Sequence, residues 1–251
     1  MKRFLTIATL LICTITHSQV YAQSDSDSIK VVPKKFYWSN SMDMFLLSTS
    51  LMEKFPATSS RLTTLRFTYF FNIGFNLNYD FNNNIGLFTG VGIKNIGFIE
   101  KFPANDSTVK RRVYAIGVPL GIKIGNIRRH NYGFIGGGVD FPFNYKEKGY
   151  VRRGKKDKFN EWFSDRTEMI MPYVFAGLSY SPGITLKLQY YPGNFLNTGY
   201  IEPSTGTAVP VMPYANYTKT NLILLSVGFD IRYSKKSKRI SVNDTPVMKT
   251  M

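Results

Sequence analysis

The sequence predicts an all-β fold, an eight-stranded antiparallel up-and-down transmembrane β-barrel. Three observations predict it: apolar residues alternate with polar or small ones, the links between the alternating segments are short and long in turn, and these segments number eight. The composition agrees, since the 251 residues include 20 Phe, 16 Tyr and 20 Gly but a single Cys. Such a chain is neither disordered, nor a disulfide scaffold, nor a coiled coil.

The first segment has the pattern of a secretory signal peptide. Lys2 and Arg3 precede an apolar stretch at residues 4–15, and Ala22 offers a small residue for cleavage. Cleavage after Ala22 also removes Cys13, so we expect a mature chain without disulfides. The expected organisation is a signal peptide at 1–22, a periplasmic linker at 23–35, the barrel at 36–233 and a basic periplasmic tail at 234–251.

Alternation is clearest at residues 65–81, where every second residue from Leu65 to Phe81 is apolar or aromatic. The interleaved residues are polar or small, with Phe70 as the exception. A period of two indicates a two-faced strand and excludes a helix. The same pattern predicts the other strands, at about 37–51, 85–94, 114–124, 132–145, 174–180, 184–191 and 223–233.

The links between these strands favour a barrel in an outer membrane. Short links at 82–84, 126–130 and 181–183 alternate with longer ones at 53–60, 102–108, 146–166 and 195–216. Short periplasmic turns and long extracellular loops are typical of outer-membrane barrels, and an even number of strands puts both termini in the periplasm. The mean hydropathy of −0.14 is compatible with this, because lipid-facing and lumen-facing residues cancel in an average.

A secreted, lipocalin-like ligand carrier is the main alternative fold, because it also has eight alternating strands. The polar face of such a carrier meets water, whereas the corresponding face here contains Gly117, Gly121 and Gly136, which suit a crowded lumen. The sequence therefore favours the membrane barrel. Pro119 lies within a predicted strand and has no backbone donor, so we expect a β-bulge at that point.

Several short motifs carry a family resemblance. They are YAIGVPLGIKI at 114–124, FIGGGVDF at 134–141, YVFAGLSY at 173–180 and SVGFDIRY at 226–233. With them, residues 36–233 resemble the PorT-like outer-membrane β-barrel family of Bacteroidetes. The resemblance implies an eight-stranded barrel in the outer membrane and, for some members, a link to protein secretion. The tail after Tyr233 departs from the terminal aromatic of many outer-membrane proteins, so an assembly signal would be internal.

The sequence has no catalytic motif, no metal-ligand cluster and no cofactor motif, so we expect no enzymatic activity, no bound metal and no cofactor. His130, the histidine of the mature chain, lies in a predicted periplasmic turn, at the end opposite to the rim of a barrel enzyme. Charged residues on the polar strand faces are expected to form ion pairs inside the lumen. This candidate lumen network comprises Arg66, Lys94, Lys123, Asp140, Lys187, Asp230 and Arg232.

The formal charge of +16 is concentrated in two places, since residues 146–166 and the tail from Ser234 each carry a net +4. No nucleic-acid-binding module accompanies this charge, so we expect no nucleic-acid partner. Outer-membrane lipid is the nearer anionic partner. The candidate rim for contact with lipopolysaccharide comprises Arg111, Arg112, Arg152, Arg153, Lys155 and Lys156.

These features predict a monomeric, non-enzymatic outer-membrane protein with a structural, interaction or secretion-accessory role, exercised through its loops or its periplasmic tail. Two alternatives stay open. An outer-membrane enzyme with an extracellular rim site would lose turnover when His130 and the loop acids are changed. A secreted ligand carrier would be recovered in the soluble fraction.

Overall fold

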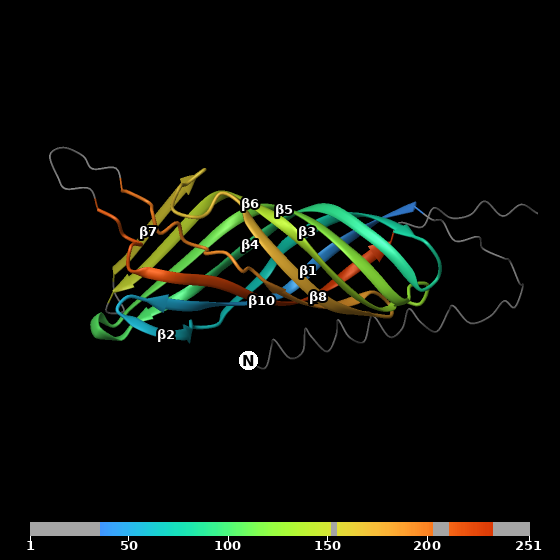
Figure 1. The fold of residues 1–251 in the computed structure, drawn as a ribbon, viewed down its shortest axis with the longest axis horizontal. Helices are drawn as coiled ribbons and strands as arrows, with labels where there is room; N and C mark the ends of the chain where they lie inside the picture. Colours follow the sequence, from blue (N-terminus) through green and yellow to red (C-terminus); the bar gives the residue numbers. More distant parts are fainter. Residues whose placement is uncertain (1–35, 152–154, 203–210, 233–251) are drawn as a thin grey trace, which may run out of the picture. The chain divides into compact units, whose positions relative to one another are not determined.

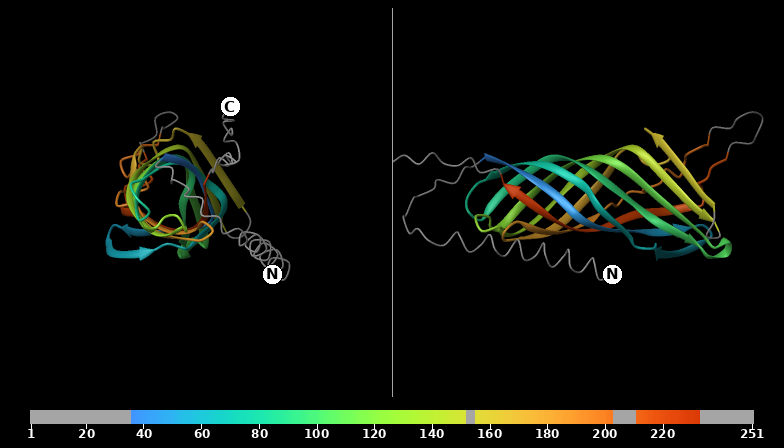
Figure 2. Two further views of the ribbon diagram at one scale, coloured as in Figure 1. Left: turned by 90° about the vertical axis from the view of Figure 1, so that its right-hand side faces the viewer. Right: turned by 180° about the vertical axis from the view of Figure 1, so that it is seen from behind.

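The computed structural model describes residues 36–151, 155–202 and 211–232. The predicted signal peptide (1–22), linker (23–35) and tail (234–251) lie outside these residues, as do Arg152 and Arg153. The described chain forms one antiparallel sheet that curls round into a barrel (Figures 1 and 2). Its elements are β1 (Phe36–Lys54), β2 (Ala57–Leu62), β3 (Arg66–Asp80), β4 (Ile85–Phe102), the 3-10 helix η2 (Pro103–Asn105), β5 (Ser107–Asn126), β6 (Asn131–Val151), β7 (Lys155–Trp162), β8 (Met171–Tyr180), β9 (Ile184–Tyr190) and β10 (Tyr217–Arg232).

The sheet closes because β1 pairs with β10, from Ser39 opposite Arg232 to Lys54 opposite Tyr217. The ring follows the order β1, β3, β4, β5, β6, β8, β9 and β10, which makes eight strands in the described chain. The two remaining strands, β2 and β7, pair only with β1 and β6 respectively. The predicted eight-stranded antiparallel barrel is therefore confirmed. Within the described ranges, no helix is long and apolar enough to cross a membrane.

The two ends of the barrel differ. One end, here called the turn end, carries the short connections at 81–84, 127–130 and 181–183 and also the outer ends of β1 and β10. The opposite end, here called the loop end, carries β2, η2, β7 and the described parts of the chain between β9 and β10, residues 191–202 and 211–216 (Figure 1). Short and long connections are thus segregated to opposite ends, as their alternation along the sequence predicts.

Two segments predicted as loops contain strand structure. Residues 146–166 hold the last part of β6 and all of β7, which form a hairpin from Val151 opposite Lys155 to Asn144 opposite Trp162. Residues 53–60 hold the start of β2, which pairs with β1. In both hairpins polar residues lie on both faces, as Lys146, Glu147 and Lys148 do in β6. The hairpins therefore lack the period-two signal on which the strand predictions depend.

The predicted bulge at Pro119 is wrong. The register between β4 and β5 is the same on both sides of that proline, and only the pairs opposite Gly90 and Val91 are missing from the ladder. The missing donor of Pro119 interrupts the ladder without an inserted residue. A register shift occurs instead between Tyr114 and Ala115, where β6 has one residue more than β5.

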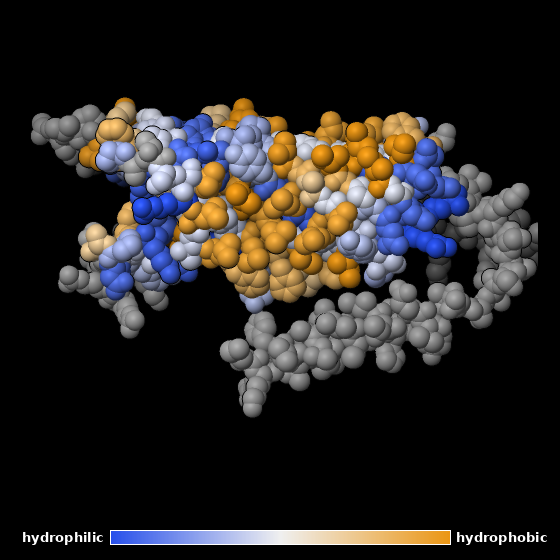
Figure 3. Space-filling view, turned by 60° about the horizontal axis from the view of Figure 1, so that its bottom comes forward, coloured by the Kyte–Doolittle hydropathy of each residue, from blue (hydrophilic) through white to orange (hydrophobic). Residues whose placement is uncertain are grey.

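The predicted alternation of faces is confirmed along the ring strands. On β5 the outward residues Ile116, Val118, Leu120, Ile122 and Ile124 are 43–61% exposed. The inward residues between them are glycine, proline and Lys123, which is 3% exposed. Figure 3 shows the result on one side of the molecule, a hydrophobic band across the middle of the barrel with hydrophilic residues toward both ends. The apolar face of these strands thus points outward, whereas in a water-soluble carrier the apolar face points inward.

Candidate functional site

The inside of the barrel changes character along its length, and β10 illustrates the change. Toward the turn end its inward residues are Ser226, Gly228 and Asp230, and toward the loop end they are Leu222 and Leu224, both 0% exposed. We call the polar part the turn half and the apolar part the loop half. The candidate functional regions are these two parts of the lumen and the outer surface at the loop end.

Glycines and aromatic rings fill the turn half in complementary pairs. A methyl group added at Gly121 would lie 2.6 Å from the ring of Phe88, and one added at Gly177 would lie 2.3 Å from Phe134. These contacts are closer than carbon atoms can approach, so only glycine leaves room for the rings. The glycine-rich inward faces thus accommodate aromatic side chains from neighbouring strands, which explains why the lumen-facing residues are so often small.

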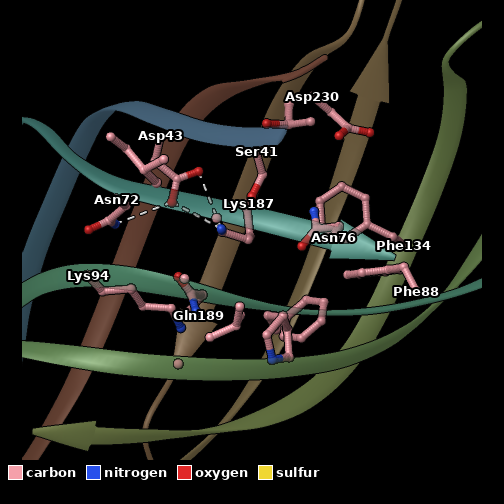
Figure 4. A pocket seen from close by; sticks show the side chains of 18 of the residues that line it. Ser41, Asp43, Asn72, Asn76, Phe88, Lys94, Phe134, Lys187, Gln189 and Asp230 are labelled. Atoms are coloured by element: carbon pink, nitrogen blue, oxygen red, sulfur yellow. Dashed lines mark hydrogen bonds and ion pairs between the residues drawn. The ribbon is translucent and has the colours of Figure 1, made fainter. Parts of the chain in front are cut away.

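A cavity of about 100 Å³ lies within the turn half (Figure 4). Two ion pairs border it: Lys94 Nζ lies 2.8 Å from Asp140 Oδ1, and Lys187 Nζ lies 3.0 Å from Asp43 Oδ2. Gln189 Oε1 also lines the cavity, and it is buried without a hydrogen-bond partner among the described residues. At roughly 10–15 Å³ for each water molecule, the cavity has room for several waters but not for a continuous pore.

The turn end of the cavity is closed by a second polar layer. The Lys123 ammonium donates to Asn78 Oδ1 and to Tyr37 Oη, which is 3.2 Å away. Tyr132 donates to Asp230 over 3.3 Å, and Arg232 donates to the carbonyl oxygen of Ile127 over 2.7 Å. Lys123, Asp230 and Arg232 therefore lie in the lumen as predicted, but their hydrogen bonds go to neutral groups.

Arg66 lies at a break in the barrel wall. The ladder between β3 and β4 ends at Ile73 opposite Ile93, so the earlier residues of β3 have no partner on β4. There Arg66 donates to the carbonyl and side-chain oxygens of Asn95, and the amide of Asn95 donates to Asn72 Oδ1. Arg66 thus closes a gap between two strands and forms no ion pair within the described chain.

The loop half is packed with apolar and tyrosine side chains. Ile96, Phe98 and Val113 point inward and are 0% exposed. The chain after β9 turns back into the mouth of the barrel, where the amides of Phe195 and Leu196 donate to Thr220 Oγ1. The residues that this returning chain buries are Tyr191, Phe195, Leu196, Tyr200 and Tyr214. The described part of the segment 195–216, which is predicted as an extracellular loop, therefore supplies part of the closure of the barrel.

Buried ion pairs lie above this apolar layer. Glu100 contacts Lys54 and lies 2.6 Å from Arg111, and it also accepts a hydrogen bond of 2.7 Å from Tyr217. Arg111 contacts Glu147 as well, at 3.3 Å. The predicted place of Arg111 on the outer rim is wrong, because its side chain points inward and is 6% exposed. Alternation decides this, since Arg111 is in phase with the inward Val113.

Of the other predicted rim residues, Arg112 lies on the outward face of β5. Lys155 and Lys156 belong to β7 and pair with Val151 and Tyr150, but the positions of their side chains are not described. The described part of the chain has no group of three His, Cys, Asp or Glu residues that could hold a metal ion.

His130 lies in the turn between β5 and β6 with a φ of 56°. Its burial, with the nearby guanidinium of Arg232, lowers the pKa of the imidazole to about 4. His130 therefore lies in a turn, as the sequence predicts, and it is partly buried and neutral at pH 7.

Two carboxylates in the lumen do not belong to the network that the sequence predicts. Asp43 holds Lys187, and Glu100 holds Arg111 and Lys54. Asp43 lies in the strand with the weakest alternation, and Glu100 lies beyond the apolar part of β4. Both carboxylates lie an even number of residues from inward residues of the same strand segment. This spacing can be recognised only when the full length of each strand is known.

A match to a protein family agrees with this architecture. Residues 22–198 match the family described as outer membrane protein β-barrel domain, and no curated protein matches the chain. One similar solved structure is Neisserial surface protein A, with 13% identity over 80% of this chain and 98% of that chain and a TM-score of 0.41. A second is the attachment invasion locus protein Ail of Yersinia pestis in complex with the heparin analogue sucrose octasulfate, with 14% identity over 80% of this chain and 100% of that chain and a TM-score of 0.33. Another is the outer membrane protein AlkL in DMPC bilayers, with 13% identity over 86% of this chain and 99% of that chain and a TM-score of 0.36. The family match covers most of the chain, so this chain belongs to the outer membrane protein β-barrel domain family and resides in the outer membrane.

Proposed function

We propose that this chain is a monomeric, closed and non-enzymatic barrel that acts as an interaction component, with its loop end outside the cell and both termini in the periplasm. The observation that carries the proposal is the filling of the lumen. The layer around Lys123 lies on one side of the cavity, and the apolar layer with Phe98 and Phe195 lies on the other. A barrel filled in this way is suited to contacts through its surface rather than to transport through its lumen.

The arrangement of charges at the loop end supports a non-enzymatic role. Glu100 and Glu147 pair with Arg111, while Glu161 and Glu202 pair with Arg166. These carboxylates are engaged in ion pairs that hold the strand ends and loops together. His130 lies at the turn end of the barrel, which is the end opposite to these acids.

The specific role that we propose is that of an accessory to protein secretion. Its support is the resemblance of residues 36–233 to the PorT-like family, in which some members are linked to secretion. The hairpin of β6 and β7 extends beyond the ring and gives the loop end a surface that a partner protein could bind (Figure 1).

The experiment measures the secreted proteins in the medium of three strains. The first lacks this chain, the second carries the full chain, and the third carries a variant in which a short turn replaces residues 148–158. We expect the full chain to restore secretion and the shortened variant to assemble without restoring it. Heat-dependent gel mobility reports assembly. Equal secretion by all three strains would contradict the proposed role, and conductance steps in a planar bilayer would contradict the closed lumen.

Orientation is tested separately with single cysteines in the otherwise cysteine-free mature chain. We expect Asn160→Cys to react with a membrane-impermeant maleimide on intact cells. Arg128→Cys, at the turn end, should react only after lysis. The reverse pattern would contradict the proposed orientation.

A further inference from the structure

Five cations occupy one outward face at the loop end, across β5, β6 and β7. The register places Arg112 directly opposite Lys146, and it places Lys110, Lys148 and Lys158 in one row across the three strands. Like charges directly opposite each other on one face destabilise a sheet. We call these five residues the basic face, and their arrangement is unfavourable unless an anion lies among them.

No protein group neutralises this face within the described chain. None of its five members takes part in an ion pair there. The nearby acid Glu147 points inward to Arg111, and Glu161 contacts Arg166. Aromatic rings lie beside two of the lysines: Lys110 Nζ is 5.4 Å from the ring centroid of Tyr150, and Lys146 Nζ is 5.1 Å from that of Tyr114. The charges therefore remain available to an external anion.

The height of the basic face on the barrel identifies the kind of anion. Along the outward side of β5, five exposed aliphatic residues from Ile124 to Ile116 come first, Tyr114 follows, and Arg112 and Lys110 come last. From Ile124 to Tyr114 the strand rises about 33 Å at roughly 3.3 Å per residue, which is about 25 Å across the membrane at a tilt of about 40°. This distance equals the apolar band of outer-membrane barrels, about 25 Å.

Aromatic residues mark the edge of this band on the neighbouring strands too. The rings of Tyr114 and Phe143 are 6.4 Å apart, and Phe143 stacks on Trp162 at 5.9 Å. Trp162 is 63% exposed. Such rings are typical of the membrane interface. Arg112 and Lys110 then lie about 5 and 10 Å farther out along the membrane normal, which is the depth of the lipid headgroups.

We propose that the basic face binds the phosphate groups of a lipid A-type glycolipid in the leaflet at the loop end. The phosphates lie between Arg112 and Lys146 and along the row of Lys110, Lys148 and Lys158. The acyl chains lie against the outward apolar residues directly below, such as Ile116 and Phe141. The phosphates of such a lipid contact the basic face while its acyl chains contact the apolar residues below. A free phosphate ion contacts only the basic face.

The basic face shares only Arg112 with the rim that the sequence predicts. Arg111 points inward, Arg152 and Arg153 lie outside the described residues, and the side chains of Lys155 and Lys156 are not described. Four lysines that the register places on the outer face take their place. The proposal rests on the proposed orientation, which puts the loop end in the outer leaflet. The labelling of Asn160→Cys tests that orientation by itself, and binding to the purified protein tests the site whatever the orientation is.

The test measures binding of lipid A to the full mature chain in lipid-free detergent by native mass spectrometry. The double variant Arg112→Gln/Lys146→Gln is compared with Arg128→Gln/Arg129→Gln, which removes the same charge at the turn end. We expect about 30-fold weaker binding for the first variant and less than a twofold change for the second. The charge-conserving variant Arg112→Lys/Lys146→Arg should retain most of the affinity.

Three further probes distinguish the ligand. Dephosphorylated lipid A should bind the wild-type chain weakly and should not distinguish it from the Arg112→Gln/Lys146→Gln variant. Phosphatidylglycerol and inorganic phosphate should compete poorly with lipid A. Equal binding of phosphorylated and dephosphorylated lipid A, or equal competition by either of the other two probes, would overturn the proposal. Heat-dependent gel mobility confirms that every variant is folded, which we expect because the substitutions relieve repulsion.

Discussion

The two halves of the lumen are filled by different chemistry. In the turn half, charged groups such as Lys94 and Asp140 pair across one intervening strand, β5, and aromatic rings pack against glycines around a cavity. In the loop half, Phe98, Phe195 and Leu222 belong to a cluster of buried apolar and tyrosine side chains. The difference teaches that the lumen of one eight-stranded ring can be filled either by paired charges or by an apolar core. Removing a side chain should therefore cost a different amount of stability in each half.

The largest effect is expected from breaking a charge pair in the turn half. Asp140 is 0% exposed and pairs with Lys94, so Lys94→Met leaves a buried carboxylate without its cation. We expect a loss of about 4 kcal/mol in the free energy of unfolding. Urea unfolding in lipid vesicles measures it. The double variant Lys94→Met/Asp140→Asn should recover most of the loss, and an unchanged midpoint for the single variant would contradict the role of the pair.

A smaller loss is expected from the apolar loop half. Phe195 is 1% exposed, and its ring lies 5.5 Å from that of Phe98. Phe195→Ala should lower the free energy of unfolding by about 3 kcal/mol, because it leaves a cavity in a packed layer. Phe163→Ala is the matched control, since Phe163 is 79% exposed. If both variants unfold at the same urea concentration, the loop half is not the packed core described above.

The fit of glycine to ring gives a third test. Gly177→Ala would bring a methyl group within 2.3 Å of Phe134 and 2.5 Å of the carbonyl oxygen of Leu186. We expect a loss of about 2 kcal/mol in the free energy of unfolding, since strands and ring must both move. Gly193→Ala introduces the same group where no atom lies within 4 Å, so it should be neutral. A neutral Gly177→Ala would show that the rings do not need these glycines.

The smallest effect at neutral pH concerns the turn end. Burial and Arg232 lower the pKa of His130 to about 4, against about 6.5 in the unfolded chain. The unfolded state therefore binds a proton first as the pH falls, so the contribution of His130 to stability decreases from pH 6.5 to about 4 and is constant below that. An NMR titration of the ring in detergent micelles should give a midpoint well below 6. Arg232→Gln should raise that midpoint, and a wild-type midpoint near 6.5 would show that the ring is solvated.

Parts of the fold could be predicted because they leave a local mark on the chain. Residues 65–81, with Phe70 as the exception, and residues 114–124 alternate because each residue faces either outward or the lumen. The inward glycines could be recognised as lumen residues for the same reason. The pairing of each glycine with a ring, such as Gly121 with Phe88, could not be predicted, because the two lie on different strands and their relative heights depend on the register.

The candidate site was predicted less completely. Arg111 and Arg112 are adjacent and equally basic, yet one pairs with Glu100 inside and the other faces outward. Composition and height cannot separate them, whereas the phase of β5 does. The hairpin of β6 and β7 was hidden in an expected loop, so the lysines that complete the basic face could not be placed on a common surface.

By itself, the sequence determined the class of the fold, the number of strands in the ring and the two faces of each strand, because a barrel in lipid repeats one local rule along every strand. The tertiary structure decided which residues of different strands come into contact, because the alternation within one strand does not contain this information. It set the partners of the lumen charges, the return of Phe195 and Leu196 into the mouth, and the row of cations at the loop end. These features depend on which residues the closed ring brings to the same height, a quantity set by register and closure rather than by any single segment.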